Sequence, residues 1–175
     1  MVAREAPADI LDLATGSGDV AFTLARRVPT AKTIRGMDFC VAMLDEAKAK
    51  MKAAASSGVR ITFEQADCHR LPLPDASVDA ITIAFGLRNL EDRAKGLQEM
   101  ERVLRPGGCL FVLEFSQPYG WMRPFYYFYL RNIIPIVSGW ITGDCQAYRY
   151  LSDSVSAFPD RNELSKEIKE SGFRS

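Results

Sequence analysis

DILDLATGSGD, residues 9–19, is the stretch that decides the fold we expect for this chain. Residues 10–14 are apolar except for Asp12 and indicate a short buried strand. Gly16 and Gly18 follow in a turn, and residues 20–27 have the composition of a helix. Glycines let the backbone bend tightly and approach a ligand, and a helix N-terminus presents N–H groups to it. Strand, glycine turn and helix together predict a nucleotide-type cofactor site.

The order of residues around the turn indicates what kind of ligand fits it. The pattern is D-x-A-x-G-x-G, whereas dinucleotide-binding turns read G-x-G-x-x-G. A carboxylate at Asp12 repels a pyrophosphate, but it suits a ligand with a cationic group beside its ribose, such as S-adenosylmethionine. The same two features argue against an NAD-binding domain, and an ordinary βα turn stays open as an alternative.

The composition predicts a single domain over residues 1–175 with an ample core, because 47% of the residues are hydrophobic. Lys plus Arg equals Asp plus Glu, with 22 residues in each group, so no global charge attracts nucleic acid. The four cysteines lie far apart and His69 is the only histidine, so we predict no metal site. No charged and then apolar leader opens the sequence, and we expect a cytoplasmic protein.

Segments with strand and helix character alternate over most of the chain. We expect strands at residues 10–14, 32–38, 60–66, 77–85 and 109–115, and helices at 20–27, 40–55 and 90–104. The sequence RPGG, residues 105–108, predicts a turn before the fifth strand. This alternation is typical of a doubly wound α/β fold with a mainly parallel sheet and right-handed crossovers. Asp160 or Asn162 is expected to cap a final helix.

Acidic residues recur where the first three strands are expected to end. Asp12 is followed by Asp38 near the end of the second strand and by Asp67 just after the third. Since parallel strands bring their carboxyl ends to one edge, these three acids predict a pocket there. Asp38 lies twenty residues after Gly18, which suits an acid that binds ribose hydroxyls, although a helix N-cap is the alternative. Asp67 is suited to an exocyclic amino group such as that of adenine, with Cys68 offering a backbone N–H.

Residues 119–145 differ in character from the rest of the chain, because they contain eight Phe, Tyr and Trp residues. Prolines and arginines interrupt this run, which argues against a membrane span. One interpretation is a flap that offers aromatic rings to an apolar substrate, and another is a helical insertion packed on the edge of the sheet. A peripheral contact with a membrane surface, at its inner face, is a third.

Several motifs resemble those of a known family. They are DLATGSGD (12–19), GMD (36–38), AFGLRN (84–89), RVLRPGGCLFVLEFS (102–116) and AYRYLSDSVSAFP (147–159). The resemblance is to the ubiquinone/menaquinone biosynthesis C-methyltransferases of the UbiE type, a class I S-adenosylmethionine-dependent family. It implies a Rossmann-like sheet of strand order 3-2-1-4-5. The family's N-terminal helical motif and its C-terminal β-hairpin of strands 6 and 7 are expected to be missing or truncated here.

The resemblance also implies an activity and a cofactor. The expected reaction is methylation of a ring carbon of a polyprenyl quinol, either demethylmenaquinol or its benzoquinol counterpart, by S-adenosylmethionine, with S-adenosylhomocysteine as product. The resemblance implies cofactor contacts at Ser17, Asp38, Asp67, Cys68 and Ala84. The residues themselves add Asp12, Gly16 and Gly18. The predicted cofactor-binding residues are Asp12, Ala14, Gly16, Ser17, Gly18, Asp38, Phe39, Asp67, Cys68 and Ala84.

Methyl transfer to an electron-rich ring needs alignment and a group that stabilises the phenolate, but no nucleophile from the protein. Arg88 is predicted to hold the phenolate oxygen, with Asn89 as its orienter. His69 is the candidate base, because its unperturbed pKa lies near neutrality. The substrate-binding residues are predicted to be Phe85, Tyr148 and Arg149.

Two further points stay open at this stage. The chain is alternatively a non-catalytic S-adenosylmethionine-binding or assembly subunit of a quinone-synthesis complex. The expected partner is a small lipophilic quinol, and a homodimer and a membrane surface are open alternatives as additional partners, whereas nucleic acid is not expected.

Overall fold

The computed structural model describes residues 1–53, 58–115, 122, 154–155 and 158–174. These residues fall into two compact units, one of residues 1–114 and 170–175 and the other of residues 115–169, and each is described by itself. The predicted flap at residues 119–145 lies outside the described residues except for Met122. Tyr148 and Arg149, two predicted substrate contacts, also lie outside them.

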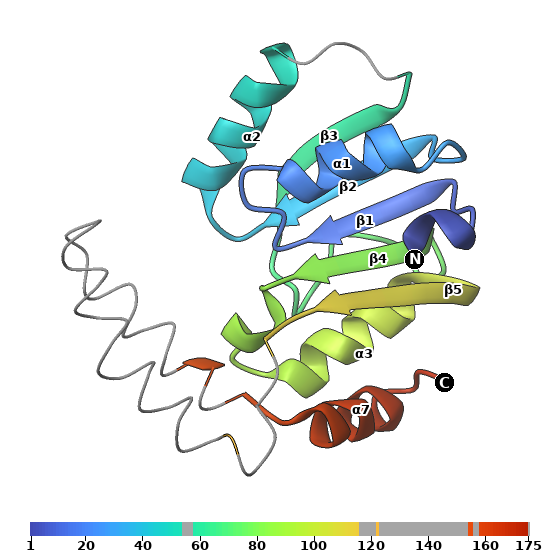
Figure 1. The fold of residues 1–175 in the computed structure, drawn as a ribbon, viewed down its shortest axis with the longest axis vertical. Helices are drawn as coiled ribbons and strands as arrows, with labels where there is room; N and C mark the ends of the chain where they lie inside the picture. The colour runs from blue at the N-terminus through green and yellow to red at the C-terminus, as the bar shows by residue number, and fades with distance from the viewer. Residues whose placement is uncertain (54–57, 116–121, 123–153, 156–157, 175) are drawn as a thin grey trace, which may run out of the picture. The chain divides into compact units, whose positions relative to one another are not determined.

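Five parallel strands form one sheet in the first unit, in the order β3-β2-β1-β4-β5. The strands are β1 (Asp9–Leu13), β2 (Thr33–Asp38), β3 (Arg60–Gln65), β4 (Val78–Ala84) and β5 (Leu104–Leu113). Their carboxyl ends meet at the edge of the sheet where the arrowheads lie in Figure 1. The predicted strand order and doubly wound α/β fold are confirmed.

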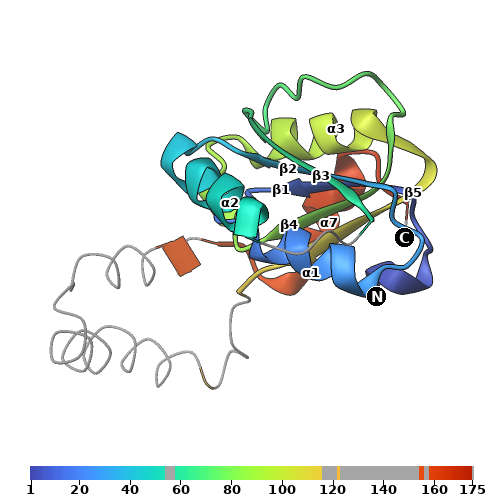
Figure 2. The same cartoon turned by 90° about the horizontal axis from the view of Figure 1, so that it is seen from above.

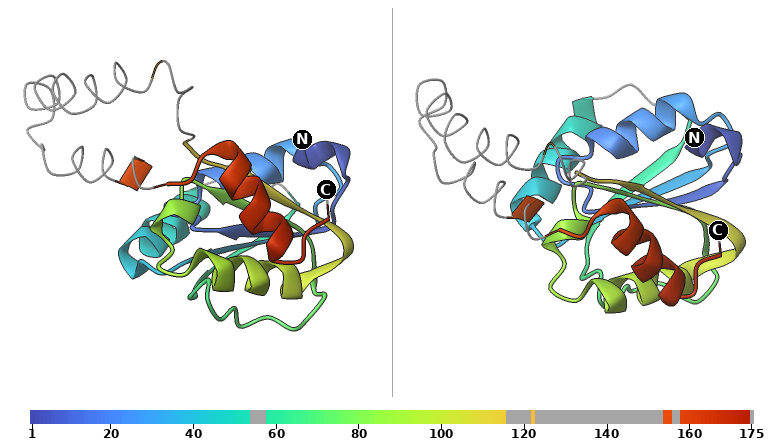
Figure 3. Two further views of the ribbon diagram at one scale, coloured as in Figure 1. Left: turned by 90° about the horizontal axis from the view of Figure 1, so that it is seen from below. Right: turned by 60° about the horizontal axis from the view of Figure 1, so that its bottom comes forward.

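Helices connect the strands and cover both faces of the sheet. They are η1 (Val2–Arg4), α1 (Asp19–Arg27), α2 (Val41–Ala53), η2 (Leu87–Asn89) and α3 (Arg93–Val103). Figures 2 and 3 show α1 and α3 on opposite faces. Apolar residues of α1 and α2 pack in one cluster with Ile10, Ile34 and Phe63 from the first three strands.

The central strands are apolar on both faces, because helices cover each side of the sheet. Ile10, Leu11 and Leu13 of β1 and Ile81 and Ile83 of β4 are at most 1% exposed. A rigid core therefore reaches the carboxyl edge, and the glycine turn after β1 and the η2 turn after β4 extend directly from it.

The predicted turn at residues 105–108 is wrong, because these residues continue strand β5. Val78 pairs with Leu104 and Ala80 pairs with Cys109, so four residues of β5 stand opposite Asp79 alone. Gly107 adopts a φ of +84°, a conformation that glycine tolerates and that lets the strand bulge outward. The Pro-Gly-Gly sequence bends the chain here without ending the pairing with β4.

The second unit is described mainly through helix α7 (Arg161–Glu170). Asp160 caps it, because its Oδ1 accepts hydrogen bonds from the N–H groups of Asn162 at 2.8 Å and Glu163 at 3.0 Å. The Glu163 carboxylate accepts a hydrogen bond from the N–H of Asp160 at 3.0 Å, which completes a capping box. Within the described ranges, no helix combines the length and apolar character that crossing a bilayer requires.

Candidate active site

The three strand-end acids lie along one edge of the sheet, on three neighbouring strands. Asp12 pairs in register with Gly36, two residues before Asp38, and Asp38 pairs with Gln65, two residues before Asp67. Each acid therefore stands about 6–7 Å further along its strand than the one before. The predicted alignment is present in the structure, and binding of a cofactor by these acids stays a prediction.

Asp38 joins the glycine turn to the start of α2. Its Oδ2 accepts a hydrogen bond from the N–H of Gly16 at 2.8 Å, and its Oδ1 accepts one from the N–H of Cys40 at 2.9 Å. Gly16 and Gly18 have φ angles of +54° and +83°, so this turn requires the conformational freedom of glycine. The contact with Cys40 reaches the residue before α2 and not the N–H groups of its first turn, so it differs from the helix N-cap that was the alternative. The position of Asp38 at the end of β2 suits the predicted contact with ribose.

The ring of Phe63 of β3 packs against Gly36 of β2 and Gly18 of the glycine turn, a contact that the sequence analysis did not predict. A Cβ on Gly36 would lie 2.6 Å from this ring, and a Cβ on Gly18 would lie 2.7 Å from it. Phe22 of α1 packs edge-on against the same ring, with centroids 5.6 Å apart. The alternation of β3 gave no indication of which loop this face would contact, because that depends on the pairing of β2 with β3.

Asp12 is almost completely buried, with 1% of its surface exposed. Its two oxygens accept hydrogen bonds from the hydroxyls of Thr15 and Thr82, each at 2.6 Å. Burial raises the pKa of Asp12 to about 6, and the charge of Asp38 acts in the same direction, while the two hydroxyls oppose the shift. The structure thus shows Asp12 supporting the turn through Thr15, and its contact with a cofactor stays a prediction.

Lys50 reaches from α2 to the glycine turn, and the sequence gave no signal for it. Its Nζ donates hydrogen bonds to Ser17 Oγ at 2.9 Å and to Asp19 Oδ1 at 3.2 Å. Ser17 Oγ in turn donates to Asp19 Oδ2 at 2.9 Å. Ser17, a predicted cofactor contact, is therefore held in a small polar network. Residues 33 positions apart meet here because α1 and α2 lie on the same face of the sheet.

His69 ties the segment after β3 to the start of α3. Its backbone N–H and its Nδ1 both contact Asp67 Oδ1, at 2.8 and 2.6 Å, and its Nε2 accepts a hydrogen bond from the N–H of Asp92 at 3.2 Å. This arrangement fits the neutral ring with its proton on Nδ1. Beside it, burial raises the pKa of the Cys68 thiol to about 11, so Cys68 stays protonated at neutral pH. The contacts of Asp67 and Cys68 with a cofactor stay predictions.

The second half of the site lies at the ends of β4 and β5. Ala84 pairs with Leu113, and Phe85 follows with a φ of +56° and a side chain that is 42% exposed. The amide of Asn89 donates a hydrogen bond to the carbonyl of Phe85 at 3.5 Å. Phe39, at the end of β2, is 75% exposed at the same edge of the sheet.

Arg88 forms an ion pair that the sequence analysis missed. Its Nη1 donates to Glu114 Oε1 at 2.6 Å, and its guanidinium lies 5.9 Å from the centroid of the Phe85 ring. Glu114 is the residue just after β5 and belongs to the RVLRPGGCLFVLEFS motif (102–116). Arg88, Asn89 and Phe85 thus lie together at the η2 turn, and their assigned roles stay predictions.

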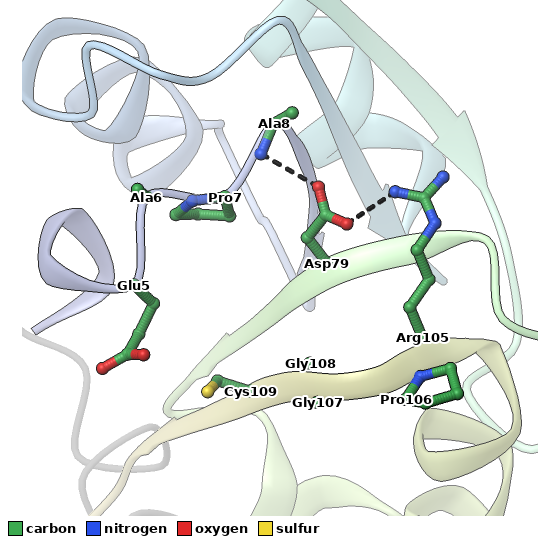
Figure 4. A pocket seen from close by; sticks show the side chains of 10 residues that line it. All are labelled: Glu5, Ala6, Pro7, Ala8, Asp79, Arg105, Pro106, Gly107, Gly108 and Cys109. Carbon is green, nitrogen blue, oxygen red and sulfur yellow. Dashed lines mark hydrogen bonds and ion pairs between the residues drawn. The ribbon is translucent and has the colours of Figure 1, made fainter.

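A cavity of about 360 Å³ opens at the amino ends of the strands, on the opposite edge of the sheet (Figure 4). Asp79 lies in its wall, where Oδ1 accepts a hydrogen bond from Arg105 at 2.6 Å and Oδ2 accepts one from the N–H of Ala8 at 2.9 Å. None of the predicted site residues that the structure describes lines this cavity. In the part of the chain that the structure describes, no three His, Cys, Asp or Glu side chains gather in a way that would hold a metal ion.

All of residues 1–175 match the model of the ubiE/COQ5 methyltransferase family. The chain belongs to this family. The resemblance given by the motifs is thereby confirmed, as is the prediction that the chain is a methyltransferase. Family membership also implies binding of S-adenosylmethionine.

Two relatives show how closely the chain follows the family. The demethylmenaquinone methyltransferase of Thermus thermophilus is 45% identical over 171 residues, which cover 97% of this chain and 76% of the relative. The ubiquinone/menaquinone biosynthesis C-methyltransferase UbiE of Syntrophotalea carbinolica is 48% identical over 166 residues, which cover 94% of this chain and 68% of the relative. The chain thus spans roughly two thirds to three quarters of these relatives.

Solved structures show that the fold is shared widely. A SAM-dependent methyltransferase from Aquifex aeolicus has a TM-score of 0.68 at 20% identity, covering 99% of this chain and 78% of that one. The [4+2]-cyclase SpnF has a TM-score of 0.57 at 28% identity, covering 63% of this chain and 40% of that one. Since one fold carries different reactions, the chemistry must be argued from the residues of the site.

Proposed function

We propose that this chain transfers the methyl group of S-adenosylmethionine to a ring carbon of a polyprenyl quinol, demethylmenaquinol or its benzoquinol counterpart. The observation that carries the proposal is the row of Asp12, Asp38 and Asp67 beside the glycine turn, in a chain of the ubiE/COQ5 methyltransferase family. Relatives over 40% identical are named for demethylmenaquinone methylation and for UbiE C-methylation, which supports a quinol as the methyl acceptor.

The carboxyl edge offers groups that fit the parts of S-adenosylmethionine, which supplies an electrophilic methyl group when bound. Asp38 offers a carboxylate to the ribose hydroxyls at the end of β2. The exposed ring of Phe39 offers a flat apolar surface to the adenine, and Asp67 offers an acceptor to its amino group. The glycine turn leaves room for the amino-acid part, and the buried charge of Asp12 favours a cationic sulfonium nearby.

Arg88 and Asn89 act on the quinol in this proposal. The Arg88 guanidinium holds the quinol oxygen as a phenolate, which raises the electron density of the ring carbon that attacks the methyl group. Asn89 orients the ring, and Phe85 offers an apolar face to it. Holding donor and acceptor in line lowers the activation barrier by several kcal/mol. In the best intramolecular reactions the effect reaches about 7–11 kcal/mol.

His69 was predicted as the base that removes the ring proton, and this role is not tested. The geometry favours a positioning role, because Nδ1 faces Asp67 and Nε2 accepts the N–H of Asp92. To act as a base, the ring would have to give up its contact with Asp92. We therefore propose that His69 mainly fixes the segment that carries Asp67 and Cys68 against the cap of α3.

Calorimetric titration tests the cofactor, and methyl transfer tests the activity. We expect S-adenosylhomocysteine to bind and NADH not to bind. Incorporation of a radiolabelled methyl group into a short-chain demethylmenaquinol analogue should follow. Binding of NADH alone would contradict the proposal, whereas binding of S-adenosylhomocysteine without transfer to either quinol type would indicate a non-catalytic subunit.

The Arg88→Ala variant tests the assignment of the acceptor side. We expect kcat to fall by about 100-fold or more, as when a donor to a developing oxyanion is removed. The affinity for S-adenosylhomocysteine should stay within about threefold of the wild type, since Arg88 is assigned to the quinol. Arg27→Ala, in the last turn of α1, is the control for loss of an exposed arginine. An unchanged kcat in Arg88→Ala would remove Arg88 from the mechanism.

A further inference from the structure

We propose that Glu114 is a positioning residue for methyl transfer and that it acts through Arg88. The inference rests on the proposed function, in which Arg88 holds the oxygen of the methyl acceptor. It adds a specific claim, namely that the guanidinium is productive only while the Glu114 carboxylate fixes it.

Glu114 accepts hydrogen bonds from both the side chain and the backbone of Arg88. Its Oε1 accepts a hydrogen bond from the guanidinium Nη1 at 2.6 Å, and its Oε2 accepts one from the Arg88 backbone N–H at 3.3 Å. One carboxylate therefore fixes the backbone of η2 and the tip of the side chain together. A guanidinium is a planar fork, so a charged partner on one side sets the direction of its remaining N–H groups.

The pair is nearly removed from solvent. The exposed fraction is 11% for the Arg88 side chain and 3% for the Glu114 side chain, against 30% and 19% for the pair of Arg102 with Glu99. Taking both charges out of water is costly, and a buried ion pair often contributes less to stability than apolar side chains of the same size. Stability is thus a weak explanation for this pair, and a defined orientation of Arg88 is a stronger one.

The surroundings keep η2 in one place, so the pair has a fixed frame. A Cβ on Gly86 would lie 2.3 Å from the Cβ of Ala14 at the end of β1, so η2 begins in close contact with the glycine-turn side of the site. Phe85 N–H donates to the carbonyl of Leu113 at 2.8 Å, which sets η2 against the end of β5. Glu114 follows directly, and its carboxylate therefore lies at the same edge as the predicted cofactor residues.

A double-mutant cycle tests the proposal, using Glu114→Gln, Glu114→Asp, Arg88→Ala and the combination of Arg88→Ala with Glu114→Gln. We expect Glu114→Gln to lower kcat between about 10- and 100-fold, because misplacing a positioned group by about 1 Å has effects of this size. The Kd for S-adenosylhomocysteine should stay within about threefold of the wild type. Glu114→Asp, which keeps the charge, should recover part of kcat. In the Arg88→Ala background, Glu114→Gln should have less than a twofold effect, because its target is gone.

Glu99→Gln is the matched control. Glu99 also accepts hydrogen bonds from an arginine, Arg102, and from a backbone N–H, that of Leu71 at 2.9 Å, but none of these three is a predicted site residue. We expect this variant to lose stability while its kcat stays within twofold of the wild type.

Three outcomes would overturn the inference. One is a wild-type kcat in folded Glu114→Gln, and another is losses that multiply in the double variant, which would mean that Glu114 acts independently of Arg88. If Glu114→Gln does not fold, the third is a loss of kcat from Glu114→Asp that is as large in the Arg88→Ala background as in the wild-type background. An inactive Arg88→Ala with an unaffected Glu114 series would overturn this inference alone. A fully active Arg88→Ala would remove Arg88 from the mechanism and this inference with it, whereas the absence of methyl transfer by the wild type would overturn the proposed function.

Discussion

At the scale of single residues, Asp12 shows how burial changes what a carboxylate does. Its oxygens face the hydroxyls of Thr15 and Thr82 and its surface is 1% exposed. Burial raises its pKa from 3.8 to about 6. The folded chain therefore holds this proton more tightly than the unfolded chain does. Its contribution to stability is fully present below the unfolded pKa and is lost as the pH rises through about 6.

The Asp12→Asn variant isolates this pH dependence. A shift of about two pKa units corresponds to about 3 kcal/mol, so wild type should lose up to that amount relative to Asp12→Asn between about pH 4 and about pH 7. Urea unfolding at a series of pH values measures the difference in the free energy of unfolding. Acids whose pKa is lowered, such as Asp9 and Glu99, affect both proteins alike and cancel. A difference that does not change with pH would show that Asp12 does not titrate in this range.

At the scale of elements, the site depends on how the ends of β1, β2 and β4 meet. The glycine turn after β1 is held by Asp38 at the end of β2, by the packed ring of Phe63 and by Lys50 of α2. The η2 turn after β4 begins in contact with the end of β1, since Gly86 lies against Ala14. The two halves of the site are therefore in direct contact where Gly86 meets Ala14.

The Gly86→Ala variant tests that contact. The new Cβ would lie 2.3 Å from the Cβ of Ala14, so one turn must move, and we expect a loss of about 1–3 kcal/mol in the free energy of unfolding. Adding Ala14→Gly removes the clashing atom, and its φ of +50° is one that glycine adopts readily. The double variant should regain most of the stability and of the affinity for S-adenosylhomocysteine. A double variant as unstable as Gly86→Ala alone would mean that the contact with Ala14 is not the cause.

At the scale of the whole first unit, one edge of the sheet carries the predicted site and the other carries contacts that stabilise the fold. The carboxyl edge holds every described residue of the predicted site, whereas Arg105 at the amino edge bridges Asp9 of β1 and Asp79 of β4 at 2.9 and 2.6 Å. Asp79 also accepts hydrogen bonds from the N–H groups of Ala8 and Asp9, at 2.9 and 2.8 Å. These contacts fix the entry of the chain into β1.

The Asp79→Ala variant should separate stability from function. The N–H groups of Ala8 and Asp9 lose their acceptor and Arg105 keeps only Asp9, so we expect the free energy of unfolding to fall by about 1–3 kcal/mol. Affinity for S-adenosylhomocysteine and kcat of the folded protein should remain unchanged, because the strands still hold the far edge. Asp75→Ala is the control, since its carboxylate is 79% exposed and its pair with Arg102 should contribute under about 1 kcal/mol. A selective loss of kcat in Asp79→Ala would show that the two edges are coupled.

Local patterns in the sequence determined the order of strands and helices and the place of the glycine turn. Hydrophobic periodicity and turn residues act within a few positions of one another, and parallel topology then brings the strand ends to one edge. The RPGG segment escaped this reasoning, because its bulge opposite Asp79 depends on pairing with β4 rather than on local bending.

Only the tertiary structure decided what surrounds each functional side chain. Three of these contacts join residues that are far apart in the sequence. The separation is 70 positions for Thr82 and Asp12, 33 for Lys50 and Ser17, and 26 for Arg88 and Glu114. No local pattern predicts such pairs, because they follow from strand register and from which helices share a face. The sequence by itself therefore determined the fold and the candidate residues at the carboxyl edge, and the packing of the sheet decided that Asp12 is buried and that Glu114 pairs with Arg88.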